Sequence, residues 1–223
     1  MLAYYLITGR GRRNTEIARP DASGPETQVR DGYKRLFDLA VLVFAHILLL
    51  PLWVVLWSVL PLAIWLTDRG PIFYTQVRVG LNGELFRIIK LRTMIVDAER
   101  ETGPVWAASN DRRTTRIGRF LRRFRFDEMP QVINICRGEM SLVGPRPERP
   151  ELVEEFTKVV PNYLKRNRVR PGFAGLAQVR GRYSTRPGDK LRYDNLYIAK
   201  MGPWLDIKLL LLALLVVLRR SPD

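Results

Sequence analysis

The chain has 223 residues, a length that suits one large domain or one domain with an appendage. Lysine and arginine total 37 against 22 acidic residues, so the net charge of +15 indicates an anionic partner: nucleic acid, an anionic membrane surface or a phosphorylated substrate. The single cysteine, Cys136, excludes an internal disulfide, and the single histidine, His46, excludes a Ser-His triad or a histidine-rich metal site in the globular part. Catalysis therefore falls to carboxylates, lysine, arginine or hydroxyl groups.

Residues 1–32 are predicted to form a tail. A short apolar start is followed by a polar segment with glycine and proline. Its GRGRR run lacks the preceding strand and following helix that a phosphate-binding loop requires, so a flexible or interfacial tail is expected.

The segment from Leu36 to Leu66 is apolar over 31 residues, with only Asp38 and His46 ionisable. It is too long for the core of a signal peptide. Buried helices of soluble proteins are the alternative, but they seldom exceed roughly 20 apolar residues. The segment therefore predicts membrane association.

Pro51 lies near the middle of this segment, where it removes one backbone hydrogen bond and clashes with the carbonyl of Ile47. One straight helix would be about 46 Å long against a hydrocarbon core of about 30 Å. Each half, of about 15 residues, is too short to cross alone. Basic residues flank both ends, which favours a re-entrant helix over residues 33–68 with both ends cytoplasmic. A kinked spanning helix is the alternative. Lys34 and Arg35 lie four and three residues before Asp38, so on a helix they are expected to pair with it.

A β-hairpin is predicted next. Apolar and polar residues alternate over 73–79, Asn82-Gly83 supplies a turn, and a second alternating run follows. In that run Lys90 and Arg92 share one face, where they could grip a phosphate or simply be solvated.

Seven arginines lie between Arg112 and Arg125, while Ile117, Phe120, Leu121 and Phe124 follow helical spacing. Such a helix suits the surface of an anionic bilayer. The alternative is a solvated helix that packs on its own core, and the neighbouring apolar segment favours the interface.

Asp127 and Glu128 come just ahead of Pro130, which suits the first turn of a helix. Free amides and the helix dipole favour negative charge there by about 0.3–1 kcal/mol, so both carboxylates are expected to be ionised. An ionised aspartate could serve as a nucleophile, and a neighbouring glutamate could bind Mg²⁺ together with substrate phosphates. N-capping with salt bridging is the alternative, which the spacing alone does not exclude.

The apolar run from Leu209 to Leu218 covers about 15 Å as a helix, too little to cross a bilayer. A buried or partly inserted helix is expected.

Six motifs occur in order: KRLFDLA before the proline-broken segment, FYTQVRVGLNGELFRIIKLRTM, RRFRFDEMPQVIN, GEMSLVGPRPERPE, RVRPGFAGLAQVRGR and DKLRYDNLYI with WLDIKLLL. From about Lys34 to Arg220 the chain resembles the bacterial sugar transferase family, the monotopic polyprenyl-phosphate phosphoglycosyl transferases, in its short form without extra N-terminal transmembrane helices. The resemblance implies a mainly helical α+β fold with a re-entrant helix, interfacial helices and a small β-hairpin. Residues 69–223 would form the catalytic domain on the cytoplasmic face of a bacterial inner membrane.

The resemblance also implies a ping-pong reaction. Asp127 would attack the sugar-bearing phosphate of a UDP-sugar and release UMP, and undecaprenyl phosphate would then accept the sugar phosphate. By the same resemblance, this would be the first membrane step of glycoconjugate or exopolysaccharide biosynthesis. Asp127 and Glu128 would form the Mg²⁺ site.

Substrate-binding residues follow from the same motifs. Arg146 in GPRP matches a phosphate-contacting arginine, and Arg122 matches the basic position five residues before the nucleophile. Further matches with less defined roles are Lys90, Arg92, Gln178 and Arg182. Arg180 stands where asparagine is usual and could change sugar or nucleotide preference.

Two other interpretations compete. The first is a nucleic-acid-binding membrane protein, which +15 and interleaved Phe and Arg suggest, but the chain has no recognition-helix pattern, zinc spacing or RNA-binding aromatic motif. The second is a non-catalytic basic membrane scaffold, against which Asp127, Glu128 and Arg146 argue. The expected partners are thus a UDP-sugar, a polyprenyl phosphate and the lipid bilayer, with no nucleic acid; self-association is left open.

Overall fold

The computed structural model describes residues 32–98, 111–181 and 186–219. The predicted N-terminal tail, apart from Gly32, and the candidate site residue Arg182 lie outside these ranges. The elements follow in the order α2 (Lys34–Leu48), α3 (Leu50–Asp68), β1 (Phe73–Val79), η1 (Leu81–Gly83), β2 (Leu85–Leu91), α4 (Arg116–Phe124), η2 (Phe126–Glu128), α5 (Gln131–Arg137), β3 (Ser141–Val143), α6 (Pro150–Val159), η3 (Tyr163–Arg168), β4 (Gly172–Ala174), α7 (Leu176–Arg180), α8 (Pro187–Lys200) and α9 (Pro203–Arg219).

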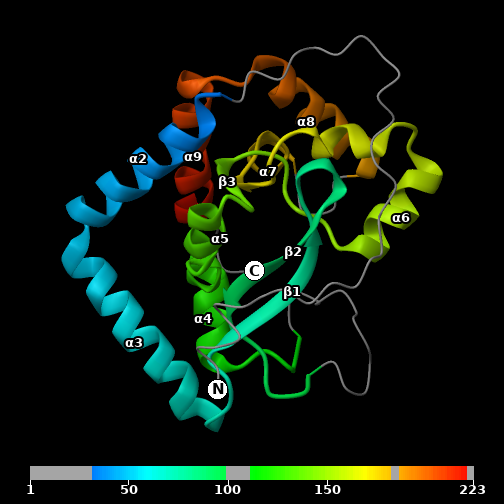
Figure 1. The fold of residues 1–223 in the computed structure, drawn as a ribbon. Coiled ribbons are helices and arrows are strands. Elements are labelled where there is room, and N and C mark those ends of the chain that lie inside the picture. Colours follow the sequence, from blue (N-terminus) through cyan, green and yellow to red (C-terminus); the bar gives the residue numbers. More distant parts are fainter. Residues whose placement is uncertain (1–31, 99–110, 182–185, 220–223) are drawn as a thin grey trace.

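The described chain is mainly helical with a small antiparallel hairpin, which confirms that part of the predicted fold class (Figure 1). Strands β1 and β2 pair from Phe73↔Leu91 to Val79↔Leu85. The predicted turn is confirmed, because Asn82 and Gly83 both have positive φ, at 52° and 85°.

A second pair, β3 and β4, is parallel and was not predicted. The backbones approach so closely that a Cβ on Gly172 would lie 1.9 Å from the amide nitrogen of Gly144. Gly144 N also donates to Ala174 O over 2.8 Å. Only glycine fits at these two positions, and the pair fixes the loop that follows β3.

Helices α2 and α3 form a V whose apex points away from the rest of the chain (Figure 1). The helix breaks at Leu49, two residues before Pro51, because proline is tolerated in the first turn of the second helix. Across the break, the rings of His46 and Trp53 stack with centroids 4.3 Å apart. The broken helix is therefore present, and α3 runs on through Pro61.

The two arms differ in length. α2 has the expected 15 residues, but α3 has 19 and is, within the described ranges, the one helix long and apolar enough by length and composition to cross a membrane. The prediction that both halves are too short was wrong for α3, which gains residues at both ends, from Leu50 to Asp68. Only 11% of the most apolar 18-residue stretch of α3 is buried.

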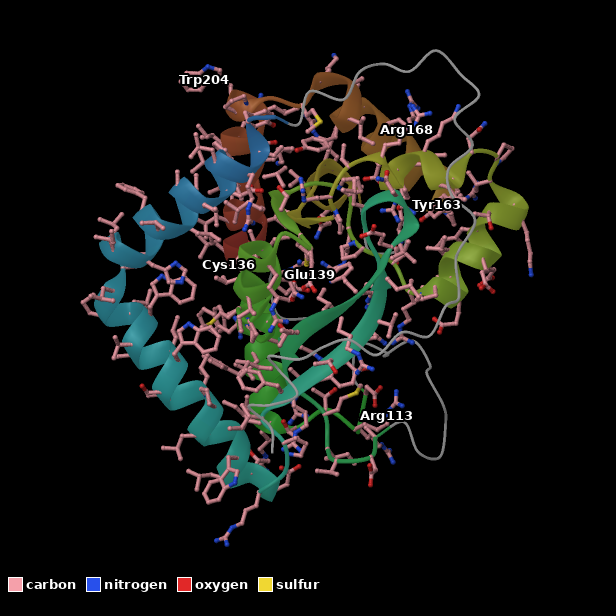
Figure 2. The ribbon with its side chains drawn as sticks, in the orientation of Figure 1. Arg113, Cys136, Glu139, Tyr163, Arg168 and Trp204 are labelled. Atoms are coloured by element: carbon pink, nitrogen blue, oxygen red, sulfur yellow. The ribbon has the colours of Figure 1, made fainter. Side chains whose placement is uncertain are left out.

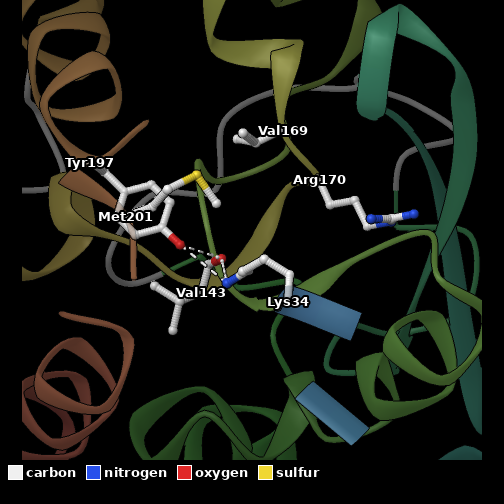
Figure 3. Close-up of a pocket in the computed structure, with 6 residues that line it drawn as sticks. All are labelled: Lys34, Val143, Val169, Arg170, Tyr197 and Met201. Atoms are coloured by element: carbon white, nitrogen blue, oxygen red, sulfur yellow. Dashed lines mark hydrogen bonds between the residues drawn. The ribbon is translucent and has the colours of Figure 1, made fainter. Parts of the chain in front are cut away.

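The start of α2 is anchored in the body by buried polar contacts. Lys34 Nζ donates to Asp206 Oδ2 over 2.8 Å. It also donates to Val143 O over 2.8 Å and lies 3.1 Å from Tyr197 Oη (Figure 3). Asp38 instead accepts from Leu142 N over 3.1 Å. The predicted pairing of Lys34 with Asp38 was therefore wrong, because Lys34 bonds to Asp206 on α9 and Asp38 bonds to the backbone of β3.

The predicted pairing of Arg35 with Asp38 was wrong as well. Arg35 donates to the backbone carbonyls of Ile135 and Cys136, at the C-terminal end of α5. Backbone carbonyls at the C-terminal end of a helix favour a cation. Arg35 therefore connects α2 to the helix that follows the acidic pair.

Helix α4 packs against α3 through Leu121, which is fully buried beside Leu60 and Ile64. Phe120 and Phe124 on the same helix are partly exposed and lie next to each other, with ring centroids 5.0 Å apart. The predicted apolar stripe is thus divided between the protein core and the surface.

Helix α9 is longer than the predicted run of 209–218, because Pro203 begins it. Leu209 and Asp206 are buried, whereas Trp204 is 84% exposed and projects outward (Figure 2). The helix is therefore buried along only part of its surface, and its expected insertion into a membrane stays a prediction.

Candidate active site

The acidic pair lies in η2, a single turn between α4 and α5. Arg125, in left-handed conformation at φ 56°, ends α4 and redirects the chain inward. Asp127 and Glu128 are consequently only 9% and 4% exposed. N-capping at a solvated helix start, the alternative interpretation of the pair, would leave them more exposed.

Asn134 holds α5 against the hairpin. Its Nδ2 donates to Arg87 O over 2.8 Å and to Glu139 Oε2 over 2.7 Å, and its Oδ1 accepts from Ile89 N over 3.0 Å. A fully buried amide with all these partners fixes the distance between the two elements. The acidic pair therefore faces Lys90, the residue that follows Ile89 on β2.

Glu128 is the electrostatic centre of the site. Its Oε1 accepts from Arg146 Nη2 over 2.8 Å and from Lys90 Nζ over 3.4 Å, while its Oε2 accepts from Arg125 Nη1 over 3.3 Å. Burial by itself raises the pKa of Glu128, but the charges of Arg146, Lys90 and Arg125 outweigh burial and lower that pKa below its usual range. Glu128 is therefore ionised.

Asp127 is in a different state. Within the described ranges no residue donates a hydrogen bond to its carboxylate. Burial, and then the charge of Glu128, raise the pKa of Asp127 to about 6, although Lys90, Arg122 and Arg146 oppose the rise. The expectation of an ionised carboxylate holds at neutral pH, but burial acts against it and makes the carboxylate more basic than an ordinary aspartate.

Arg122 lies one turn before the acidic pair and is held by two hydroxyls. Its Nε donates to Thr93 Oγ1 over 2.9 Å, and its Nη1 lies 3.3 Å from Thr114 Oγ1. The positive charge of Arg122 lowers the pKa of Asp127 and so opposes the effect of burial.

Two predicted residues bond elsewhere. Arg92 forms an ion pair with Asp68 at the end of α3. Gln178 donates through Nε2 to Phe173 O over 3.2 Å, within the β4–α7 segment. The structure thus brings together Asp127, Glu128, Lys90, Arg122 and Arg146, and Arg92 and Gln178 make no bond to the acidic pair.

Arg166 and Asp194 are residues that the sequence reasoning missed. Arg166 Nη2 donates to the backbone carbonyl of Arg146 over 2.8 Å, its Nε to Asp194 Oδ2 over 2.8 Å, and its Nη1 to Tyr163 Oη over 3.1 Å. Both charged groups are almost fully buried. They fix the backbone of the residue whose side chain reaches Glu128, and no sequence spacing links positions 166 and 194.

The acidic pair suits Mg²⁺ that is shared with a substrate. The described residues contain no group of three or more His, Cys, Asp or Glu side chains that could hold a metal ion. Mg²⁺ is commonly bound through one or two carboxylates plus substrate phosphates, so two adjacent carboxylates are a sufficient protein contribution. The oxygens of Asp127, which no described donor occupies, fit this better than those of Glu128.

Residues 29–220 match the family described as Bacterial sugar transferase. The chain belongs to this family. The match covers both arms of the V and the whole buried site, and it confirms the resemblance inferred from the six motifs.

Curated relatives agree with this assignment. One is "UDP-glucose:undecaprenyl-phosphate glucose-1-phosphate transferase" of Caulobacter vibrioides, 42% identical over 200 residues that cover 86% of this chain and 72% of the relative. Another is "UDP-N-acetylgalactosamine-undecaprenyl-phosphate N-acetylgalactosaminephosphotransferase" of Aeromonas hydrophila, 38% identical over 74% of this chain. The chain spans 40% of the Aeromonas protein and 39% of a Klebsiella pneumoniae relative, so these relatives are considerably longer.

Proposed function

We propose that this chain transfers a sugar-1-phosphate from a UDP-sugar to undecaprenyl phosphate through a covalent intermediate on Asp127, with release of UMP. The single observation that supports this most is the asymmetry of the acidic pair. Glu128 is fixed by three cations, while Asp127 is buried with a raised pKa and accepts no hydrogen bond from a described residue. Such a carboxylate is suited to be a nucleophile. The names of the family relatives supply the donor and acceptor classes.

In the first step, an oxygen of ionised Asp127 forms a bond to the phosphorus that carries the sugar. The bond from that phosphorus to the bridging oxygen breaks, and this oxygen leaves with the electron pair as part of UMP. In the second step, an oxygen of the polyprenyl phosphate attacks the same phosphorus and the aspartyl oxygen leaves, which restores the carboxylate. Neither step requires a proton transfer.

The cations around Asp127 stabilise the charge of both transition states. Phosphoryl transfer depends mainly on positioning and on neutralisation of phosphate oxygens. Arg122 on α4, Lys90 on β2 and Arg146 in the loop after β3 all act on Asp127. Asp127 and Glu128 would hold Mg²⁺ together with substrate phosphate oxygens, and the bound ion would neutralise part of the phosphate charge.

We also propose that α2 and α3 form a re-entrant hairpin on the cytoplasmic face of the inner membrane. Both arms return to the body, and their outer surfaces carry exposed apolar side chains, among them Phe44, Ile47, Val54 and Leu62. A polyprenyl acceptor has its phosphate at headgroup level, so a site at the base of such a hairpin could reach it. The partly exposed Phe120 and Phe124 of α4 would lie at the same interface.

The released nucleotide tests this function. Purified protein would be incubated with Mg²⁺, undecaprenyl phosphate and a panel of UDP-sugars, and the nucleotide products separated by chromatography. We expect UMP with at least one sugar, which would also identify the donor. UDP would show an ordinary glycosyl transfer and contradict the proposal, and neither nucleotide with any sugar would favour the scaffold interpretation.

A further inference from the structure

The inner face of the hairpin carries a second arginine close to the site. In the β1–β2 register, Arg78 pairs with Phe86, Gln76 with Ile88, and Tyr74 with Lys90. Side chains of directly opposed residues lie on the same face of a sheet. Arg78 therefore lies on the face from which Lys90 reaches Glu128.

Arg78 is held by neutral acceptors alone. Its Nη1 donates to Pro147 O over 3.1 Å and its Nη2 to Gln76 Oε1 over 2.7 Å. Its Nε is buried and has no hydrogen-bond partner among the described residues. Because Pro147 follows Arg146 directly, the two guanidinium groups belong to one small region.

No carboxylate of the described residues forms an ion pair with Arg78. The charge of Glu148 favours the charged form of Arg78, but Glu148 Oε1 already pairs with Lys190 over 3.2 Å. Burial, and then the charge of Arg146, lower the pKa of Arg78 to about 10, which still leaves the group charged at neutral pH. A half-buried cation with a buried Nε and no carboxylate partner is costly, so its retention beside other cations calls for an anionic ligand.

We propose that Arg78 binds the diphosphate of the donor nucleotide, as a second phosphate-binding guanidinium next to Arg146. This inference rests on the proposed function. Gln76 and the carbonyl of Pro147 fix the fork of Arg78 in place, and its remaining N–H groups can meet phosphate oxygens in the bidentate manner that guanidinium favours. The diphosphate also supplies the negative charge that this face of the hairpin lacks.

The test uses Arg78→Met with Arg87→Met as a matched control. Arg87 lies on the same hairpin but pairs with Val77 on the opposite face, and it is exposed. The affinity of the full chain for UDP would be measured by calorimetry, and its Tm by thermal unfolding without ligand. We expect Arg78→Met to weaken UDP binding about ten-fold or more, at an unchanged or higher Tm, and Arg87→Met to change neither.

A purely structural role for Arg78 predicts the reverse. Arg78→Met would then lower the Tm and keep its UDP affinity, which would overturn the inference. Arg78→Lys distinguishes the two roles if the methionine variant folds poorly. Lysine retains the charge and would restore part of the UDP affinity of a phosphate-binding residue, whereas no restoration would contradict the inference.

The wild-type protein separates this inference from the proposed function. If it releases UMP and binds UDP while Arg78→Met binds UDP equally well, only the role of Arg78 is wrong. If the wild-type protein neither releases UMP nor binds UDP, the proposed function is wrong, and the assignment of Arg78 to a diphosphate is wrong with it.

Discussion

Arg146 Nη2 lies 2.8 Å from Oε1 of Glu128, the immediate neighbour of the proposed nucleophile. This contact pairs the Glu128 carboxylate with an arginine in the loop after β3. Asp127 is therefore the carboxylate that is available to react. Adjacent acids with opposite pKa shifts are a recurrent device for giving two similar groups different roles. The two carboxylates should therefore respond in opposite ways to neutralisation.

Asp127→Asn should abolish turnover and at the same time stabilise the protein. The raised pKa of Asp127 means that the folded state binds this proton more tightly than the unfolded chain does. The free energy of unfolding therefore falls as pH rises from about 4 to about 6, and asparagine removes this loss. In EDTA, we expect a Tm about 3–6 °C above wild type at pH 7.5 and no difference below pH 4.

The matched control for that variant is Glu155→Gln, which neutralises an exposed acid on α6. Its Tm should follow that of the wild type at every pH. Substantial turnover by Asp127→Asn would show that Asp127 is not the nucleophile.

Glu128→Gln should destabilise the protein. The substitution leaves Arg146, Lys90 and Arg125 near one another without the carboxylate that all three contact. Loss of one member of a buried ion pair commonly costs about 3–5 kcal/mol. Chemical unfolding should show a loss of at least about 2 kcal/mol, and stability equal to that of the wild type would mean that the three cations do not depend on Glu128.

Arg166 should act as a positioning residue through the backbone of Arg146. Arg166→Met leaves Asp194 buried and unpaired, so it should lower both stability and activity. The double variant Arg166→Met/Asp194→Leu removes the unpaired charge and should regain most of the stability. We expect its kcat to remain about ten-fold low, because Arg146 O has lost its donor. If activity returned together with stability, the pair would be structural only.

Gly118→Ala should disturb the start of α4. A Cβ at this position would lie 1.9 Å from Thr93 O, and Thr93 also holds Arg122 through its hydroxyl. We expect a loss of about 1–3 kcal/mol in unfolding free energy together with reduced turnover. Gly188→Ala in α8, where no atom lies within 4 Å of the added Cβ, is the control and should be neutral or slightly stabilising.

The re-entrant arrangement can be tested by cysteine labelling in a Cys136→Ser background. Gly32 and Pro71 flank the two arms of the V and are exposed, so cysteine at either position should be accessible. Both should react with a membrane-impermeant maleimide only in inside-out vesicles. Labelling of one position in each vesicle orientation would show instead that the segment spans the membrane.

The local features of the fold were predictable from local chemistry. Asn82-Gly83 accepts positive φ, and Pro51 removes a backbone hydrogen bond near the middle of the apolar segment, so the hairpin turn and the broken helix follow from short stretches. Strands β3 and β4 were not predictable, because three residues each are too few to show alternation.

The site was predictable in its residues but not in its energetics. The acidic pair and its basic neighbours stand out in the sequence, whereas the raised pKa of Asp127 depends on burial that only the tertiary structure creates. Ion pairs between residues far apart in the sequence likewise depend on the tertiary structure. Lys34 is 172 positions from Asp206, and a nearer acid, Asp38, offered a plausible helical partner.

The covalent intermediate is the central claim, and a single-turnover measurement tests it most directly. The protein would be mixed with Mg²⁺ and its UDP-sugar donor in the absence of polyprenyl phosphate, and UMP would be quantified against protein while intact mass is recorded. We predict a burst of up to about one UMP per protein, with an added mass equal to one sugar phosphate less one water, and neither in Asp127→Asn. UMP release that begins only when polyprenyl phosphate is added would show direct transfer and contradict the intermediate.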